Sequence, residues 1–149
     1  IPAHDASKGI HRQRQIEIAI QLFEAMGIER DDKERRQDWV LRGFRQFDAP
    51  VSIVLAYDSS LEPATISHFD LGAIVYGLTL AAWTRGLGTV INGQGIMQSD
   101  VVREHAKIPD WQTIMTCVAM VYPDEDFSAN KVKSRRTPND EIISYVGFE

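Results

Sequence analysis

The stretch RGLGTVINGQG, Arg85–Gly95, decides how the middle of this chain folds. Its first residues are typical of a helix end, and the following ones predict a strand over Thr89–Asn92. Asn92–Gly95 then forms a glycine-rich turn. Glycines after a strand let backbone N–H groups approach a planar ligand without side-chain collision, so this turn is a candidate binding loop. A plain strand-to-helix connection is the alternative, because the stretch lacks both the dinucleotide-binding fingerprint and the P-loop lysine.

The helix expected before this stretch is apolar on nearly all sides. Over Phe69–Thr84 the only charged residue is Asp70, and Ser67 is placed to cap the helix N-terminus. A helix with this pattern is buried, so we expect it to be the central core helix or to line a subunit interface. Gly72 and Gly77 lower its helix propensity, which suits a position where another backbone or a ligand comes close.

The remaining elements follow from the spacing of apolar residues. Helices are predicted over Ile10–Met26, Asp32–Phe47 and Asp100–Ala106, and strands over Val51–Tyr57, Ile114–Val121 and Ile142–Val146. In the first strand, Val51, Ile53 and Leu55 would fill one face of the sheet, and Ser52, Val54 and Ala56 the other. This pattern predicts a strand that is covered on both faces. This order predicts one layered α+β domain over residues 1–149. A sheet of so few strands cannot fully cover the apolar central helix. We therefore also expect the protein to self-associate.

Composition limits the classes of function. The 149 residues suffice for one domain, and the net charge of −5 argues against a nucleic-acid binder. The lone Cys117 excludes an internal disulfide and is expected to be a buried small hydrophobe. No apolar stretch approaches the roughly 20 residues of a membrane span, so we expect no membrane partner and a cytoplasmic location.

A cationic tract, Lys131–Arg136, stands out in this acidic chain. On an extended chain Lys131, Lys133 and Arg135 point to one side and Arg136 to the other. Three cations on one side suit a dianionic phosphate, and the guanidinium groups add directional hydrogen bonds. A solvated basic tail is the alternative. Together with the glycine turn, the tract supplies the two parts that a flavin mononucleotide (FMN) site needs.

No side chain is predicted to bind a metal or to act as the catalyst. His4, His11, His68 and His105 lack the spacing of metal ligands. The chain contains no Gly-x-Ser-x-Gly element and no carboxylate pair that would suit acid–base catalysis.

Several motifs in register resemble the nitroreductase family of FMN-dependent oxidoreductases, from about Arg35 to the end of the chain. They are Phe47–Val51, Asp70–Gly72 with Leu78–Ala82, Arg85–Thr89, Val101–Glu104 followed by Ile108-Pro109, Val121–Pro123, Asn130, Ser134–Pro138 with Glu141, and Gly147-Phe148.

This resemblance implies an α+β fold with a mixed or antiparallel sheet flanked by helices and a long buried central helix. It also implies a homodimer with FMN at the interface and a C-terminal arm, Ile142–Val146, that reaches the partner subunit. It implies a ping-pong reaction in which NADH or NADPH reduces the flavin, which then reduces a nitroaromatic, a quinone or a similar small aromatic acceptor. The flavin carries the chemistry. The residues that the resemblance places at the cofactor are Asn92, Gly93, Gln94 and Gly95 at the ring, and Lys133 and Arg135, with Arg136 as the alternate, near the phosphate.

One departure leaves a second function open. Family members usually begin with an arginine-rich, serine-containing segment that grips the phosphate, and the chain resembles only the C-terminal two-thirds of a typical member. The alternative is therefore a truncated, non-catalytic dimer of the same fold that binds a small molecule or a partner.

Overall fold

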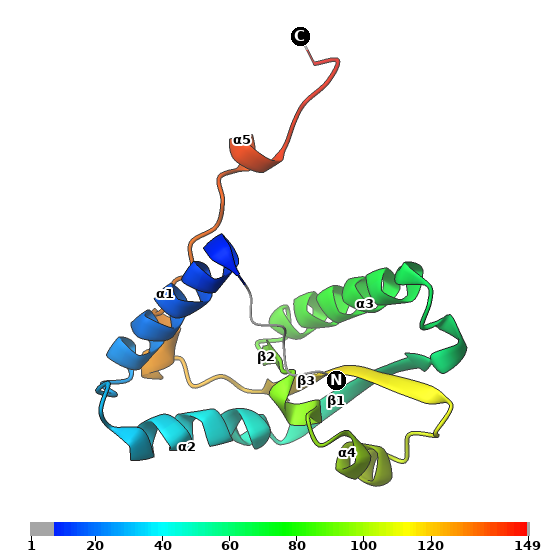
Figure 1. The fold of residues 1–149 in the computed structure, drawn as a ribbon, viewed down its shortest axis with the longest axis horizontal. Helices are drawn as coiled ribbons and strands as arrows, with labels where there is room; N and C mark the ends of the chain where they lie inside the picture. Colours follow the sequence, from blue (N-terminus) through cyan, green and yellow to red (C-terminus); the bar gives the residue numbers. More distant parts are fainter. Residues whose placement is uncertain (1–7, 149) are drawn as a thin grey trace. The chain divides into compact units, whose positions relative to one another are not determined.

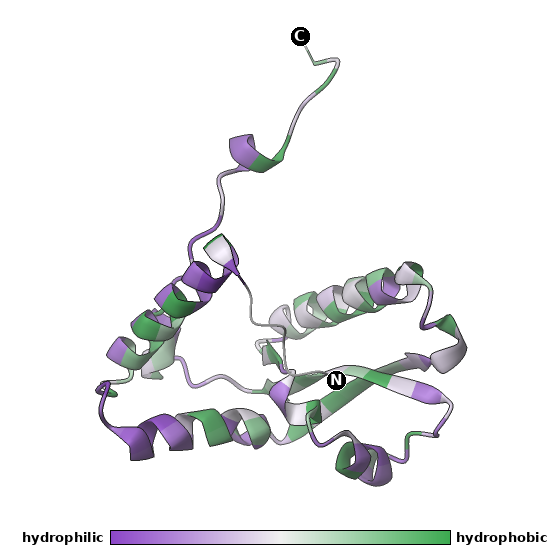
Figure 2. Cartoon of the chain, viewed as in Figure 1, coloured by the Kyte–Doolittle hydropathy of each residue, from purple (hydrophilic) through white to green (hydrophobic). Residues whose placement is uncertain are grey.

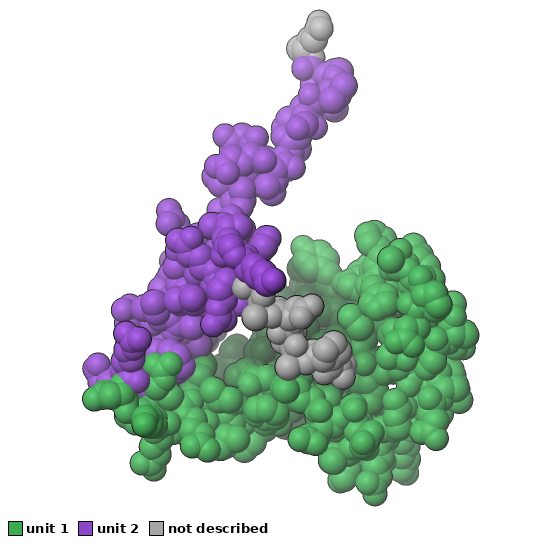
Figure 3. Space-filling view, viewed as in Figure 1, with its two compact units in different colours: residues 1, 31–124 green, residues 2–30, 125–149 purple. Residues whose placement is uncertain are grey.

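The computed structural model describes residues 8–148. The chain divides into two compact units, one formed by residues 31–124 and the other by residues 8–30 together with 125–148 (Figure 3). The first unit contains the sheet, and the second contains the first helix and the end of the chain. That residues 1–149 form a single domain stays a prediction.

The sheet has three antiparallel strands, β1 (Val51–Asp58), β2 (Gly88–Ile91) and β3 (Gln112–Val121). β3 lies in the centre, in the order β1-β3-β2 (Figure 1). Cys117 and Val118 of this central strand are fully buried. The strands predicted over Val51–Tyr57, Thr89–Asn92 and Ile114–Val121 are confirmed, with bounds within two residues of those predicted.

The helix bounds are Gly9–Ala25 for α1, Lys33–Phe44 for α2, Thr65–Trp83 for α3, Ser99–Ala106 for α4 and Asn139–Ile142 for α5. Within the first unit, α3 and α4 lie on opposite faces of the sheet (Figure 1). On one face Leu55 and Val118 pack with Val75 of α3. On the other face Ile114 and Cys117 pack with Ile96, with Val102 of α4 against them. The predicted α+β class and the two-sided cover are confirmed.

Three predicted details are wrong. α2 ends at Phe44 instead of reaching Phe47, because Gln46, Phe47 and Asp48 adopt positive φ angles of 58°, 55° and 60°. Ser67 is not an N-cap: α3 begins two residues earlier, and the Ser67 hydroxyl donates to the Ala64 carbonyl at 2.8 Å.

The third correction concerns the predicted last strand over Ile142–Val146. Only Ile142 of this range belongs to a helix, at the end of α5, and residues 143–148 are irregular. Ile142, Tyr145 and Phe148 are exposed by 65%, 73% and 83%. A strand needs a neighbouring strand to pair with, and none of the described residues pairs with this segment.

α3 buries only one stripe of its surface, so residues 8–148 do not cover it on nearly all sides. Ser67, Val75 and Ala82 are buried, whereas Phe69 and Trp83 are 74% and 76% exposed. Apolar residues nevertheless recur along the whole helix (Figure 2). By length and composition α3 would also suffice to cross a membrane, contrary to the expectation that no stretch is long enough.

Candidate functional site

The predicted ring-binding loop, Asn92–Gly95, directly follows β2. The backbone N–H of Asn92 donates to the Cys117 carbonyl at 2.8 Å, which extends the pairing of β2 with β3. Gln94 then begins the short 3-10 helix η3 (Gln94–Ile96). Gly93 is exposed, and Gln94 and Gly95 are half-buried. The strand therefore presents the loop at its carboxyl end, as the sequence predicts.

The Asn92 side chain holds the loop from inside. It is 4% exposed, and its Nδ2 donates to the Gly43 carbonyl at 2.7 Å and to Gln46 Oε1 at 3.0 Å. Its Oδ1 accepts from the backbone N–H of Gln94 at 3.1 Å. Since both donors are used within the unit, Asn92 shapes the loop and does not offer its amide group to a ligand.

Gln94 and Gly95 are also set by packing. Gln94 Nε2 lies 3.5 Å from the Val40 carbonyl of α2, and a Cβ atom on Gly43 would lie 1.9 Å from Gln94 Oε1. A Cβ atom on Gly95 would lie 1.8 Å from Gln46 Nε2 and 2.8 Å from Cys117 Sγ. Close packing against Gln46 and Cys117 thus favours glycine at position 95. From the sequence we had instead expected this glycine to make room for a planar ligand.

The backbone of this loop, by contrast, keeps hydrogen-bonding capacity. Among residues 8–148, no group accepts a hydrogen bond from the N–H of Gly93 or Gly95, whereas the N–H of Gln94 donates to Asn92 Oδ1. Two backbone donors two residues apart can bind the polar edge of a planar ring. The arrangement therefore fits a ligand that is recognised through main-chain amides.

Gln46 is the site residue that the sequence did not reveal. Its Nε2 donates to Cys117 Sγ at 3.2 Å while its Oε1 accepts from Asn92, and Cys117 Sγ donates to the Asn92 carbonyl at 2.8 Å. Burial raises the pKa of the Cys117 thiol above its ordinary value, so the thiol stays protonated. No local signal marks this network, because Gln46 and Cys117 are 71 residues apart in sequence.

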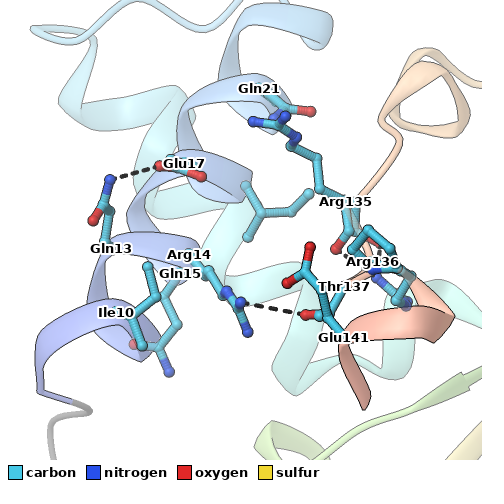
Figure 4. A pocket seen from close by; sticks show the side chains of 13 residues that line it. Ile10, Gln13, Arg14, Gln15, Glu17, Gln21, Arg135, Arg136, Thr137 and Glu141 are labelled. Carbon is cyan, nitrogen blue, oxygen red and sulfur yellow. Dashed lines mark hydrogen bonds between the residues drawn. The ribbon is translucent and has the colours of Figure 1, made fainter. Parts of the chain in front are cut away.

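The predicted phosphate-binding residues lie in the other unit. Lys131 ends the 3-10 helix η4 (Ser128–Lys131), so the expected alternation of side chains starts only at Val132, which is extended. Lys133, Arg135 and Arg136 are all exposed. Arg135 and Arg136 line a groove against α1, and Lys133 does not (Figure 4). The structure thus places the four loop residues, Asn92–Gly95, in the first unit. Two of the three predicted cations, Arg135 and Arg136, line one groove of the second unit.

The described part of the chain contains no cluster of three or more His, Cys, Asp or Glu side chains that could hold a metal ion. The candidate site is therefore built from backbone amides and cations.

Comparison with known proteins identifies relatives of the chain. The model of the nitroreductase family matches residues 6–122. The chain is 32% identical to chloronitrobenzene nitroreductase of Comamonas testosteroni over 126 residues, which cover 85% of this chain and 55% of that protein. The identity and coverage are the same for nitrobenzene nitroreductase of Ectopseudomonas oleovorans. The chain thus spans about 55% of the length of these curated relatives.

Solved structures share the fold. The FMN- and NADPH-dependent nitroreductase NfnB from Sphigopyxis sp. strain HMH superposes with a TM-score of 0.86 at 24% identity, covering 99% of this chain and 66% of that one. The FMN-dependent nitroreductase NfnB from Mycobacterium smegmatis, in complex with NADPH, gives a TM-score of 0.84 at 20% identity, covering 98% and 65%. At these identities the similarity establishes the fold.

Proposed function

Because residues 6–122 match the family model, this chain belongs to the nitroreductase family, and on that premise we propose that it is part of an FMN-dependent oxidoreductase that reduces nitroaromatic or similar acceptors with NADH or NADPH. Relatives named for the reduction of chloronitrobenzene and nitrobenzene favour a small nitroaromatic acceptor. The structural neighbours described as FMN- and NADPH-dependent favour these two cofactors.

One observation carries the proposal: the loop after β2 offers backbone amides while its side chains turn inward. The N–H groups of Gly93 and Gly95 have no acceptor among residues 8–148. The buried Asn92 amide fixes the loop against α2 through Gly43 and Gln46. Preorganised donors of this kind favour a ring that gains negative charge, because they need no reorganisation when the charge develops.

The roles of the remaining residues follow from charge. When bound, FMN would accept reducing equivalents from the nicotinamide and pass them to the acceptor in two half-reactions. Gly93 and Gly95 would donate to the ring edge. Lys133, Arg135 and Arg136 would neutralise the phosphate, since guanidinium and ammonium groups bind phosphate oxygens strongly.

The exposed side of α3 supports a homodimer as the assembled form. Apolar side chains recur there at helical spacing on the face opposite the sheet-packed Val75, namely Ile66, Phe69, Tyr76, Leu80 and Trp83. Exposed apolar side chains gathered on one face of a helix often mark an interaction surface. We propose that a second copy covers it, and that the exposed residues after α5 reach that copy.

A spectrum of the protein as isolated, with titration of FMN into the stripped protein, tests the proposal. We expect flavin absorbance, micromolar or tighter binding of FMN, and oxidation of NADH or NADPH that depends on a nitroaromatic acceptor such as nitrobenzene. A protein that binds FMN without turnover would favour the non-catalytic alternative. A protein that does not bind FMN would contradict the proposal.

A further inference from the structure

The chain leaves α2 through a strained turn. Gln46, Phe47 and Asp48 have φ angles of 58°, 55° and 60°, a region that residues with a Cβ atom seldom adopt. At the end of the turn the Asp48 carboxylate is held by Arg42 Nη2 at 3.5 Å and by Arg45 Nε at 3.3 Å. Backbone strain of this kind persists only where the surroundings fix it, and it concentrates at functional sites. The turn therefore calls for a functional explanation.

This turn directs the Gln46 side chain against the loop that follows β2. Gln46 Oε1 accepts from Asn92 Nδ2 at 3.0 Å. Gln46 Nε2 lies so close to Gly95 that a Cβ atom there would be 1.8 Å away. The half-buried Gln46 thus contacts the first and the last residue of the loop, although it belongs to a different element.

Gln46 also closes a cycle of three hydrogen bonds that begins and ends on Asn92. Asn92 Nδ2 donates to Gln46 Oε1 at 3.0 Å, and Gln46 Nε2 donates to Cys117 Sγ at 3.2 Å. Cys117 Sγ completes the cycle by donating to the Asn92 backbone carbonyl at 2.8 Å, in preference to Gln46 Oε1 at 3.5 Å. Every member donates once and accepts once, an arrangement in which each bond strengthens the next.

The cycle decides which way the Asn92 carboxamide faces. Its Nδ2 lies between two acceptors, Gln46 Oε1 and a backbone carbonyl of α2, so Oδ1 must face the Gln94 N–H, which it meets at 3.1 Å. That N–H lies between those of Gly93 and Gly95, which have no acceptor among residues 8–148. The directions of these two donors therefore depend on Gln46.

We propose that Gln46 is a positioning residue for the cofactor ring, which acts through Asn92 to aim the N–H groups of Gly93 and Gly95 so that they bind the reduced ring more tightly than the oxidised one. The proposal rests on the proposed function. The reduced ring carries more negative charge, and donors already aimed at that charge stabilise it. Gln46 needs no contact with the ring, because its effect passes through the loop.

Gln46→Met in the full chain tests the proposal. Methionine keeps the length of the side chain but has no carboxamide and offers Asn92 only a weak acceptor. The control is Gln98→Met, since Gln98 is exposed and its side chain makes no cap hydrogen bond at the start of α4. For each protein we would measure the binding of oxidised FMN and the midpoint potential of bound FMN. We would also record the amide NMR signals of Gly93 and Gly95 without cofactor.

We expect Gln46→Met to weaken reduced FMN about ten-fold more than oxidised FMN. For a two-electron couple this equals a fall of about 30 mV in the midpoint potential. The amide signals of Gly93 and Gly95 should move in the cofactor-free variant, and Gln98→Met should leave the potential and both signals unchanged. A purely structural role of Gln46 would lower the melting temperature and weaken both forms of FMN equally.

A second pair of variants opens the same cycle at Cys117 and decides the question if Gln46→Met does not fold. The hydroxyl in Cys117→Ser can donate and accept as the thiol does, whereas Cys117→Ala can do neither. We expect Cys117→Ala to move the potential and the two glycine signals in the same direction as Gln46→Met. Cys117→Ser should stay close to the wild type.

The NMR measurement separates this proposal from the proposed function. If the wild type neither binds FMN nor oxidises NADH or NADPH, the proposed function fails. Glycine signals that move in Gln46→Met and not in Gln98→Met would still support the positioning role. If the wild type binds FMN and turns over, the proposed function stands. The positioning role is then overturned if Gln46→Met keeps the wild-type potential, or weakens both forms of FMN equally.

Discussion

The Asn92 side chain donates to the backbone carbonyl of Gly43 at 2.7 Å, joining the end of β2 to the end of α2 across 49 positions of sequence. Asn92 is 4% exposed and Gly43 is buried, so this bond is made where water cannot replace it. The conformation of the loop that would receive the flavin ring therefore depends on the contact between β2 and α2.

Replacing Asn92 by leucine should lower the free energy of unfolding by about 2–4 kcal/mol, because it leaves the Gly43 carbonyl and Gln46 Oε1 without their donor. Urea denaturation of the cofactor-free protein measures the loss. The exposed Gln98 of the same region provides the control, and Gln98→Ala should change stability by less than about 0.5 kcal/mol. Equal effects of the two changes would contradict the structural role of Asn92.

Gly95→Ala should destabilise the fold by about 1–3 kcal/mol, since the new methyl group would meet Gln46 Nε2 at 1.8 Å. Gln46→Ala removes that obstacle and leaves only Cys117 Sγ, at 2.8 Å, close to the new methyl group. It costs stability itself, because Asn92 and Cys117 each lose their hydrogen bond to Gln46. The double variant should therefore lose less than the sum of the two single variants. Additive losses in a double-mutant cycle would show that the contact is not the cause.

The buried Cys117 thiol predicts a loss of stability at alkaline pH. Its pKa is raised by burial in the folded state, so the folded protein holds this proton more tightly than the unfolded chain, whose thiol titrates near pH 8.5. The contribution is complete below about pH 8.5 and is lost as the pH rises toward the folded pKa. Urea unfolding from pH 7 to pH 10 measures the slope.

Cys117→Ala is the matched control for that slope, because every other titrating group is unchanged. We expect the variant to be less stable at pH 7 and its stability to fall less steeply above about pH 8.5. Parallel pH profiles for the two proteins would contradict the assignment to Cys117.

Leu80→Glu should reduce self-association, because it places a charge in the apolar face of α3 that we propose a second copy covers. Leu80 is 48% exposed. Light scattering coupled to gel filtration should give a dimer for the wild type and a smaller mass for the variant. Val101→Glu, at a similarly exposed position on α4, should remain dimeric.

Two other results would contradict this prediction. A monomeric wild-type protein would leave the α3 face uncovered by a second copy. Recovery of the protein only in the detergent-extracted membrane fraction would instead favour the span that the length and composition of α3 allow.

Local patterns in the sequence predicted most of the elements of the first unit. The alternation over Val51–Tyr57 is a strand because its two sets of side chains face Val75 and Ile96 on opposite sides of the sheet. The early end of α2 was not predictable from the same kind of signal, since three non-glycine residues at Gln46–Asp48 take positive φ angles that local propensity disfavours.

The sequence predicted where the candidate site lies, but not which contacts hold it in place. Asn92–Gly95 lies where the motif suggested, yet the Asn92 amide faces inward to Gly43 and Gln46. The basic tract was recognised from composition. The sequence did not show that two of its arginines line a groove together with Arg14 of α1. Nothing in the spacing around Arg14 indicates a groove, because the opposite wall is supplied by residues 134–141.

The sequence by itself determined which segments are helices and strands, because apolar spacing and turn residues act over a few positions of chain. It also determined that a glycine loop and a cluster of cations exist. Only the tertiary structure decided which atoms of the loop stay available and which arginines share a groove. Hydrogen bonds depend on distance and direction between groups tens of residues apart, and those are set only when the chain has packed.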